Sequence, residues 1–207
     1  MSLLQLAGVH TFIEQFHILE GVDLEVGEGE IVALLGRNGA GKTTTLRTIL
    51  GLNPARSGSV VFDGDDITAR RSFDIAAMGI GYVPEHRAIF ADLSVEENLR
   101  IAERKPGDLA KKEEFIFGLF PDLKRLIRLP GTNLSGGQQQ MLAVARALVA
   151  DNRLLLIDEP SEGLAPVIFE QMMEAIRQLS SESTVLLVEQ NFIVASRLAQ
   201  RYVIVEE

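Results

Sequence analysis

The chain has 207 residues, of which 46% are hydrophobic, enough for a sizeable core in one large domain or in a domain with a subdomain. The formal net charge of −9 argues against a nucleic-acid-binding surface, and the lack of cysteine excludes disulfides and thiolate metal sites. The N-terminal stretch, residues 1–14, lacks the pattern of a signal peptide, and no apolar run in the sequence approaches the length of a membrane span.

The first third of the chain predicts mainly strands. Residues 22–26 alternate apolar and acidic side chains, which indicates a half-exposed antiparallel strand. Further apolar runs bounded by turn residues predict strands at 31–35, 59–62 and 80–83. A helix is predicted over 42–50, because Gly51 and Pro54 follow it as stop signals.

From about residue 94 the sequence becomes helical. Ser94 and Glu97 fit a capping box. Helices are predicted at 111–120, 122–129 and 136–150, and no strand pattern appears before residue 154. We therefore expect a helical subdomain over residues 87–150, inserted into an α/β core formed by residues 1–86 and 151–207.

The last part of the chain returns to alternating strands and helices. Strands are predicted at 154–157, 184–188 and 202–205, with a helix over 167–179 between the first two. Strands that alternate with helices favour a mostly parallel α/β sheet covered by helices on both faces.

One segment between a predicted strand and a predicted helix has the composition of a phosphate-binding loop. Residues 36–43 fit the pattern G-x-x-x-x-G-K-[ST]. Backbone N–H groups of such a turn and the positive end of the following helix point at one spot, which suits a triphosphate. Lys42 adds a charge for the β and γ phosphates, and the Thr43 hydroxyl can bind Mg²⁺. The predicted nucleotide-binding residues here are Gly36, Arg37, Asn38, Gly39, Ala40, Gly41, Lys42, Thr43 and Thr44.

Two carboxylates, Asp158 and Glu159, end the apolar run at 154–157. In an open α/β sheet, ligands bind at the carboxyl ends of the strands. We therefore expect Asp158 beside the phosphate loop, where it can hold Mg²⁺, and Glu159 near the γ-phosphate, where it can polarise an attacking water. The alternative is an acidic turn at a strand end without a chemical role.

A second candidate anion site lies at the start of the predicted helix 136–150. Ser135 has the character of an N-cap, and two glycines, Gly136 and Gly137, follow it before Gln138. A hydroxyl, two glycines and free N–H groups also suit a phosphate. The capping and anion-binding interpretations are compatible.

These motifs, in this order and spacing, resemble those of the ATP-binding cassette (ABC) ATPases. The resemblance rests on the Lys42 loop, on Leu-Ser-Gly-Gly-Gln at 134–138 and on Asp158 and Glu159 followed by Pro160, and it covers essentially the whole chain. Local variants are similar to the ATPase subunits of branched-chain amino-acid importers, with urea importers as the nearest confusable relatives. These variants lie at 84–85, 95–99, 138–140, 161–166 and 188–191.

The resemblance implies a P-loop NTPase fold in which a mostly parallel core carries antiparallel N-terminal strands and the inserted helical subdomain. It also implies a subunit that binds ATP with Mg²⁺ and hydrolyses ATP to power import, peripheral to the cytoplasmic face of the inner membrane. Lys42, Glu159 and Gln190 would be the catalytic residues.

The resemblance further implies partners that this chain does not encode. Cassettes of the family work as head-to-tail dimers, so Ser135, Gly136 and Gly137 of one subunit would close over the γ-phosphate bound at Lys42 of the other. The second subunit would be another copy or a sister ABC ATPase. Two membrane permease subunits and, indirectly, a solute-binding protein complete the expected assembly, without nucleic acid.

Four positions depart from the general family pattern. Glu85 stands where Gln is usual and would contact metal-bound water, Gln190 stands where a switch His is usual, and Ala165 replaces an Asp. These three match the branched-chain subgroup. Adenine usually stacks on an N-terminal aromatic residue, and that slot falls on Ile13 with Phe12 beside it; we assign the contact to Phe12, with core packing as the alternative.

Other functions remain as alternatives. A non-transport cassette would carry coiled-coil insertions, tandem cassettes or basic arms, and a GTPase would need an N-K-x-D motif; the sequence shows none of these. A small-molecule kinase does not explain the segment 134–138, and Glu159 argues against a cassette that only binds nucleotide. The chain stops at Glu207, where relatives usually continue, so we expect either a truncated or a short member of the family.

Overall fold

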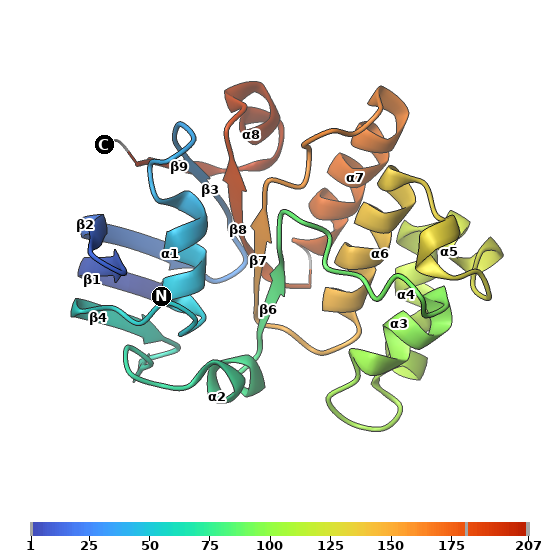
Figure 1. The fold of residues 1–207 in the computed structure, drawn as a ribbon, viewed down its shortest axis with the longest axis horizontal. Helices are drawn as coiled ribbons and strands as arrows, with labels where there is room; N and C mark the ends of the chain where they lie inside the picture. The colour runs from blue at the N-terminus through green and yellow to red at the C-terminus, as the bar shows by residue number, and fades with distance from the viewer. Residues whose placement is uncertain (1, 181, 206–207) are drawn as a thin grey trace.

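The computed structural model describes residues 2–180 and 182–205. Met1, Ser181, Glu206 and Glu207 lie outside the described residues, as do the parts of the predictions at the two chain ends that fall on them. Figure 1 shows a small antiparallel sheet at the left, a parallel sheet through the middle and a group of helices at the right. None of the helices in this part of the chain combines the length and the apolarity needed to span a bilayer.

The antiparallel sheet is built on a long hairpin. Strand β1 (Ser2–Ile13) pairs with β2 (Phe16–Gly27) from end to end, and the sheet continues through β4 (Ser57–Phe62) to β5 (Asp65–Asp66). The predicted strand at 22–26 is confirmed as part of β2. The length of the hairpin escapes the sequence pattern, because register shifts interrupt the alternation of apolar and polar side chains on which the prediction relies.

The parallel sheet contains β3 (Ile31–Leu35), β6 (Ile80–Val83), β7 (Leu154–Asp158), β8 (Thr184–Glu189) and β9 (Arg201–Ile204) in the order β6-β7-β8-β3-β9. The strands predicted at these places are confirmed. All residues of β3, β7 and β8 are buried, which explains their continuous apolar sequences. Since the strands run parallel, their carboxyl ends meet at one edge, at the top in Figure 1.

Helices cover both faces of the parallel sheet. One face packs on α1 (Lys42–Ile49), and α2 (Ser72–Ala77) lies beside it. The other face packs on α6 (Gly136–Leu148), α7 (Pro166–Leu179) and α8 (Phe192–Leu198). Successive side chains of each strand therefore enter different cores, so that in β8 Leu186 and Val188 face α1 whereas Val185 and Leu187 face α7.

Between β6 and β7 the chain is helical, as the sequence predicts. It forms α3 (Val95–Ile101), α4 (Asp108–Leu119), α5 (Pro121–Arg125), the 3₁₀ turn η1 (Gly131–Asn133) and α6. The helix predicted over 122–129 is wrong in its second half, because the carbonyls of Ile127 and Leu129 accept the first free N–H groups of α3. We propose residues 87–150 as the helical subdomain and 1–86 with 151–207 as the core.

The sequence analysis missed α2 and α8. Both helices are a single turn or two long, too short for an apolar period to stand out. For α8 a local signal does exist, since the Asn191 side chain caps the helix by accepting from the Ile193 N–H at 2.9 Å.

A buried amide, that of Asn98 in α3, fixes the segment that leads from β6 into the helical part. Its Oδ1 accepts from the Phe90 N–H at 2.8 Å, and its Nδ2 donates to the carbonyls of Phe90, Leu93 and Ser94 at 2.9, 3.1 and 3.0 Å. Asn98 is fully buried, so the backbone groups that it contacts have little access to water.

We predict that Asn98→Ala lowers the free energy of unfolding by about 2–4 kcal/mol, because it leaves several buried backbone groups without partners. Urea denaturation of the parent and the variant measures the difference. Asn133→Ala, which changes the same residue type at an exposed position, serves as the control and should shift stability by less than about 0.5 kcal/mol. Equal effects of the two changes would contradict the anchoring role of Asn98.

Candidate nucleotide-binding site

The phosphate loop lies between β3 and α1, at the carboxyl edge of the parallel sheet. Gly39 and Gly41 have φ angles of 93° and 91°, in the region that side chains rarely adopt. Gly41 caps α1 without any side-chain hydrogen bond, and the first turn of α1 holds no acidic residue. The free N–H groups and the positive end of α1 are thus left for an anion.

Lys42 is a buried cation at the start of α1. Only 4% of its side chain is exposed, and its Nζ donates to the Arg37 carbonyl at 3.1 Å. The same Nζ lies 3.1 Å from Oε1 of Glu159, the first residue after β7. Two residues that the sequence placed on the same phosphate are thereby brought into contact, and a phosphate that reaches Lys42 competes with Glu159 for it.

Asp158 lies beside the phosphate loop, as predicted. Its Oδ1 accepts from the Thr43 hydroxyl at 3.2 Å and its Oδ2 from the Tyr82 hydroxyl at 3.4 Å. Burial raises the pKa of the Asp158 carboxyl, the hydrogen bond from Thr43 opposes that shift, and the charges of Glu159 and Glu85 add to it. Burial and the charge of Asp158 likewise raise the pKa of Tyr82.

The residues around Asp158 fit a magnesium ion better than a softer metal. The Thr43 hydroxyl and the Asp158 carboxylate offer two hard oxygen donors within hydrogen-bond distance of each other. Within the described residues no cluster of three or more His, Cys, Asp or Glu side chains forms a metal site of its own. Such a pair of oxygens suits an ion that takes its remaining ligands from phosphates and water.

A cleft of about 360 Å³ opens over the phosphate loop. It contains the Lys42 cation and the carboxylates of Glu85, Glu159 and Glu162. Its further lining consists of loop and hairpin residues, namely Ile13, Ile18, Asn38, Gly39, Gly41, Thr43 and Thr44. The predicted site residues from the phosphate loop, the end of β7 and the end of β6 are thus gathered in one place.

Phe12 lies away from that lining. Its ring stacks on His17, with centroids 4.1 Å apart and planes inclined by 5°, and the Arg56 guanidinium sits 4.7 Å from the ring centroid. Its neighbour Ile13 lines the cleft instead. Adenine contact by Phe12 stays a prediction, and the geometry favours Ile13, because adjacent strand residues point to opposite faces.

Ser135 caps α6 in the way the sequence indicates. Its Oγ accepts from the Gln138 N–H at 3.3 Å, and Gln138 Oε1 accepts from the Ser135 N–H at 2.9 Å, which completes a capping box. A serine hydroxyl has one hydrogen to donate besides its acceptor lone pairs. The cap uses the oxygen as an acceptor, so the hydrogen of the exposed Ser135 hydroxyl remains for a ligand.

The two glycines after Ser135 are needed for different reasons. A Cβ at Gly137 would lie 2.6 Å from Ile168 of α7, and one at Gly136 would lie 3.1 Å from the Arg87 guanidinium. Gly137 is therefore required by packing, whereas the absence of a side chain at Gly136 leaves the start of α6 accessible beside the Arg87 cation. Binding of phosphate by Gly136 and Gly137 stays a prediction.

Gln190 follows the last residue of β8 and is exposed. It is not among the side chains that line the cleft, so its role toward the γ-phosphate also stays a prediction. Two further polar residues escape prediction from the sequence: Glu189, which precedes Gln190, and Ser161, in the turn after Glu159, share a hydrogen bond of 3.1 Å. A polar residue at the end of the apolar run 184–188 was the one local signal.

The geometry defines a nucleotide-binding α/β cassette, with the phosphate loop at the carboxyl edge of the parallel sheet. Comparison with known proteins agrees: the family model described as ABC transporter matches residues 19–162. The chain therefore belongs to the ABC transporter family and is an ATPase of the cassette type.

The names of similar curated proteins state more than one transported compound. The high-affinity branched-chain amino acid transport ATP-binding protein BraG of Pseudomonas aeruginosa is 43% identical over 96% of this chain and 86% of its own length. The probable branched-chain amino acid transport ATP-binding protein LivF of Archaeoglobus fulgidus is 38% identical over 86% of this chain and 77% of its own length. The lipopolysaccharide export system protein LptB of Escherichia coli is 35% identical over 92% and 81%.

A solved structure shares both the fold and some sequence. The dimeric, post-hydrolysis ATP-binding cassette MJ0796, bound to ADP and Pi, aligns with a TM-score of 0.85 at 25% identity, over 98% of this chain and 94% of that chain. The predicted fold class is thereby confirmed.

We predict that Gly41→Ala weakens ATP binding by roughly tenfold or more, equivalent to about 1.4 kcal/mol, because the φ of 91° strains an alanine and its Cβ would lie 2.7 Å from Leu19 Cδ2. Calorimetric titration with ATP measures the affinity. Gly64→Ala is the matched control, since Gly64 has a φ of 80° with open space around it. An equal loss of ATP affinity in both variants would contradict the prediction, because it would show that a strained backbone away from the cleft weakens binding as much as the change at Gly41.

Proposed function

We propose that the chain is the ATP-binding and ATP-hydrolysing subunit of an importer for branched-chain amino acids. The observation that carries the ATPase part is the convergence of Lys42 and Glu159, 3.1 Å apart, beside the phosphate loop. The branched-chain part is supported by the names of BraG and LivF. Import of urea or of another amino acid or amide is the alternative, and a non-transport ABC ATPase is a more distant one.

In this proposal the phosphate loop holds the nucleotide before any chemistry. The N–H groups of the loop and of the start of α1 donate to the phosphates, and Lys42 moves from Glu159 to the β and γ phosphates. Thr43 and Asp158 would hold Mg²⁺, and Glu85 would accept from metal-bound water. When bound, Mg²⁺ neutralises charge on the phosphate oxygens.

Glu159 is the proposed general base. Its φ of 44° turns the chain sharply after β7, and its backbone N–H donates to the Val188 carbonyl at 3.0 Å. A strained backbone at the carboxylate that contacts Lys42 fits a catalytic position. Once Lys42 binds phosphate, the carboxylate is free to accept a proton from the attacking water, and Gln190 is proposed to donate to a γ-phosphate oxygen.

Hydrolysis in this proposal needs a second cassette. The phosphate loop leads into α1 whereas Ser135 caps α6, and in this proposal Ser135, Gly136 and Gly137 of one subunit cover the γ-phosphate of the other in a head-to-tail dimer. Dimerisation of MJ0796 supports this arrangement. The second subunit is a copy of this chain or a sister ABC ATPase.

The proposed location follows from the proposed work. As the motor of an importer, the dimer docks on two membrane permease subunits at the cytoplasmic face of the inner membrane, and a solute-binding protein delivers the solute to them. Deleting the gene and measuring uptake of radiolabelled leucine and urea tests the cargo. Loss of leucine uptake alone is expected, and loss of urea uptake alone would overturn the assignment.

We predict that Glu159→Gln binds MgATP but hydrolyses it at least ~100-fold more slowly, a loss of about 2.7 kcal/mol in transition-state stabilisation, because the amide cannot take a proton from water. The variant should also accumulate as an ATP-bound dimer, since separation follows hydrolysis. Phosphate release and size-exclusion chromatography measure the two effects.

The control for this change is Glu162→Gln, which removes another carboxylate from the same cleft. It should hydrolyse ATP within about threefold of the parent if the loss in Glu159→Gln reflects base catalysis rather than the charge of the cleft. Near-normal turnover of Glu159→Gln would remove Glu159 from the role of base.

A mixing experiment tests the two-subunit site. Ser135→Arg should leave ATP binding to the monomer largely intact and abolish turnover, because the arginine blocks closure over the nucleotide of the partner. Mixed with Lys42→Ala, it should regain part of the activity, since each heterodimer then holds one complete site. Loss of nucleotide binding by isolated Ser135→Arg would contradict a site shared between subunits.

A further inference from the structure

A buried carboxylate that the proposed mechanism does not use lies at the end of β8. Glu189 is 2% exposed and stands opposite Leu35, the last residue of β3. Because side chains alternate along a strand, Glu189 follows Val185 and Leu187 onto the face that packs on α7 and α8. Asp158 follows Leu154 and Leu156 onto the opposite face, toward α1, so the two carboxylates have separate surroundings.

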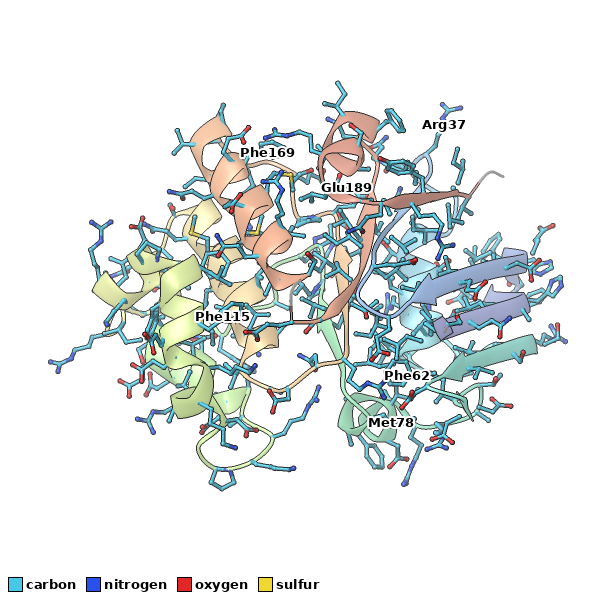
Figure 2. The ribbon with its side chains drawn as sticks, turned by 180° about the vertical axis from the view of Figure 1, so that it is seen from behind. Arg37, Phe62, Met78, Phe115, Phe169 and Glu189 are labelled. Carbon is cyan, nitrogen blue, oxygen red and sulfur yellow. The ribbon has the colours of Figure 1, made fainter. Side chains whose placement is uncertain are left out.

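One oxygen of Glu189 is bonded and the other is not. The Ser161 hydroxyl donates to Oε2 at 3.1 Å, whereas the buried Oε1 has no hydrogen-bond partner. Figure 2 shows Glu189 inside the molecule near the upper edge, while Arg37 of the phosphate loop projects outward. Burying a carboxylate with an unbonded oxygen costs folding free energy. An apolar residue at this position would pack without that cost, so packing alone does not account for Glu189.

The charges around Glu189 are few. Burial raises its pKa to about 7, and the charge of Glu159 adds to the increase, whereas Ser161 and the backbone at Asn191 oppose it. The strand β3 contributes no ionisable side chain at the paired position, Leu35. Arg197, on α8, is paired with Glu170 of α7, and Lys42 is paired with Glu159.

The turn after β7 is fastened to β8 at two points. The Glu159 N–H donates to the Val188 carbonyl at 3.0 Å, and the Ser161 hydroxyl donates to the Glu189 carboxyl. Glu159, the residue at the first of these points, has a φ of 44°, in the left-handed region that residues other than glycine rarely adopt. Without the hydrogen bond from Ser161 to Glu189, this strained backbone is free to relax, and the Glu159 carboxylate is no longer oriented toward Lys42.

We propose that Glu189 is a positioning residue for ATP hydrolysis: through Ser161 it holds the turn that aims the Glu159 carboxylate at the phosphate cleft. The inference rests on the proposed role of Glu159 as the general base. In this inference the orientation of the Glu159 side chain is set by the contacts of its turn with β8 as well as by its own contact with Lys42.

The anchor depends on pH. The pKa of Glu189 in the folded chain, about 7, lies above the ordinary value of 4.5, so the stability gained from the neutral acid is fully present below about pH 4.5 and is lost as the pH rises through about 7. Ionised Glu189 also repels the charge of Glu159. The ionised carboxylate accepts more strongly from Ser161 than the neutral acid does, so hydrolysis by the parent should contain a component that rises between about pH 6 and pH 8 while the stability of the fold falls.

The test compares kcat and KM for ATP between pH 5.5 and 8.5 in the full chain and its variants. Glu189→Leu and Ser161→Ala should each lower kcat roughly tenfold, the size expected for one lost hydrogen bond, with KM changed less than about threefold. The double variant should be no slower than Glu189→Leu alone, because that change already removes the contact with the Ser161 hydroxyl together with the backbone contacts of the carboxyl at Ser161 and Asn191. Glu189→Gln should recover most of kcat and lose the pH-dependent component, since its amide oxygen accepts from Ser161 and does not titrate.

A matched control separates positioning from stability. Ser183→Ala removes a hydrogen bond of 2.7 Å to the Asn152 carbonyl near the other end of β8, so it should lower the melting temperature without lowering kcat. If Glu189→Leu does not fold, Ser161→Ala carries the test from the other side of the same bond. Unchanged kcat in Ser161→Ala, additive losses in the double variant, or an unaltered pH profile in Glu189→Gln would each overturn the proposal.

The outcome also distinguishes this inference from the function on which it rests. If Glu159→Gln hydrolyses ATP like the parent, the role of Glu159 fails first. If Glu159→Gln is inactive while Ser161→Ala and Glu189→Leu match the parent, only the positioning role fails. Melting temperatures of the parent and Glu189→Gln across the same pH range give a readout without activity, and equal profiles would rule out a titrating anchor.

Discussion

The site depends on the parallel register of three neighbouring strands. In β7, β8 and β3, Asp158 lies opposite Val188 and Leu35 lies opposite Glu189, so three segments that are far apart in sequence leave the sheet at the same edge. The backbone hydrogen bonds of these pairings bring together the phosphate loop, the acidic turn and the segment with Gln190. A shift of one residue in either pairing would turn every side chain of that strand to the other face.

The charge balance of the cleft supports the proposal that the nucleotide binds together with a cation. Lys42 is paired with Glu159, while Glu85 and Asp158 add negative charge within reach of the same space. A triphosphate alone adds more negative charge than Lys42 and the helix start offset. In the proposed function, Thr43 and Asp158 would hold a hard divalent cation, which would supply the positive charge that this balance lacks.

Sequence reasoning reaches the motif residues because their chemistry is local. The phosphate loop, the cap at Ser135 and the pair of carboxylates after β7 are read from consecutive residues, and the structure places them where strand ends and helix starts require. Tertiary facts escape it. The alignment of β1 with β2 is hidden by register shifts, the end of α5 depends on α3, and the burial of Glu189 is invisible in a run of strand residues.

The two faces of the sheet divide the proposed work at its carboxyl edge. Toward α1 lie the groups that are proposed to bind phosphate and metal, and Thr43 and Asp158 are in contact there. Toward α7 and α8 lies Glu189, which is proposed to hold the turn through its hydrogen bond from Ser161. Glu159 connects the two faces, because its backbone is fixed to β8 while its side chain reaches Lys42 on the α1 side. A strained turn at this place is therefore the means by which one strand directs a side chain across the edge of the sheet.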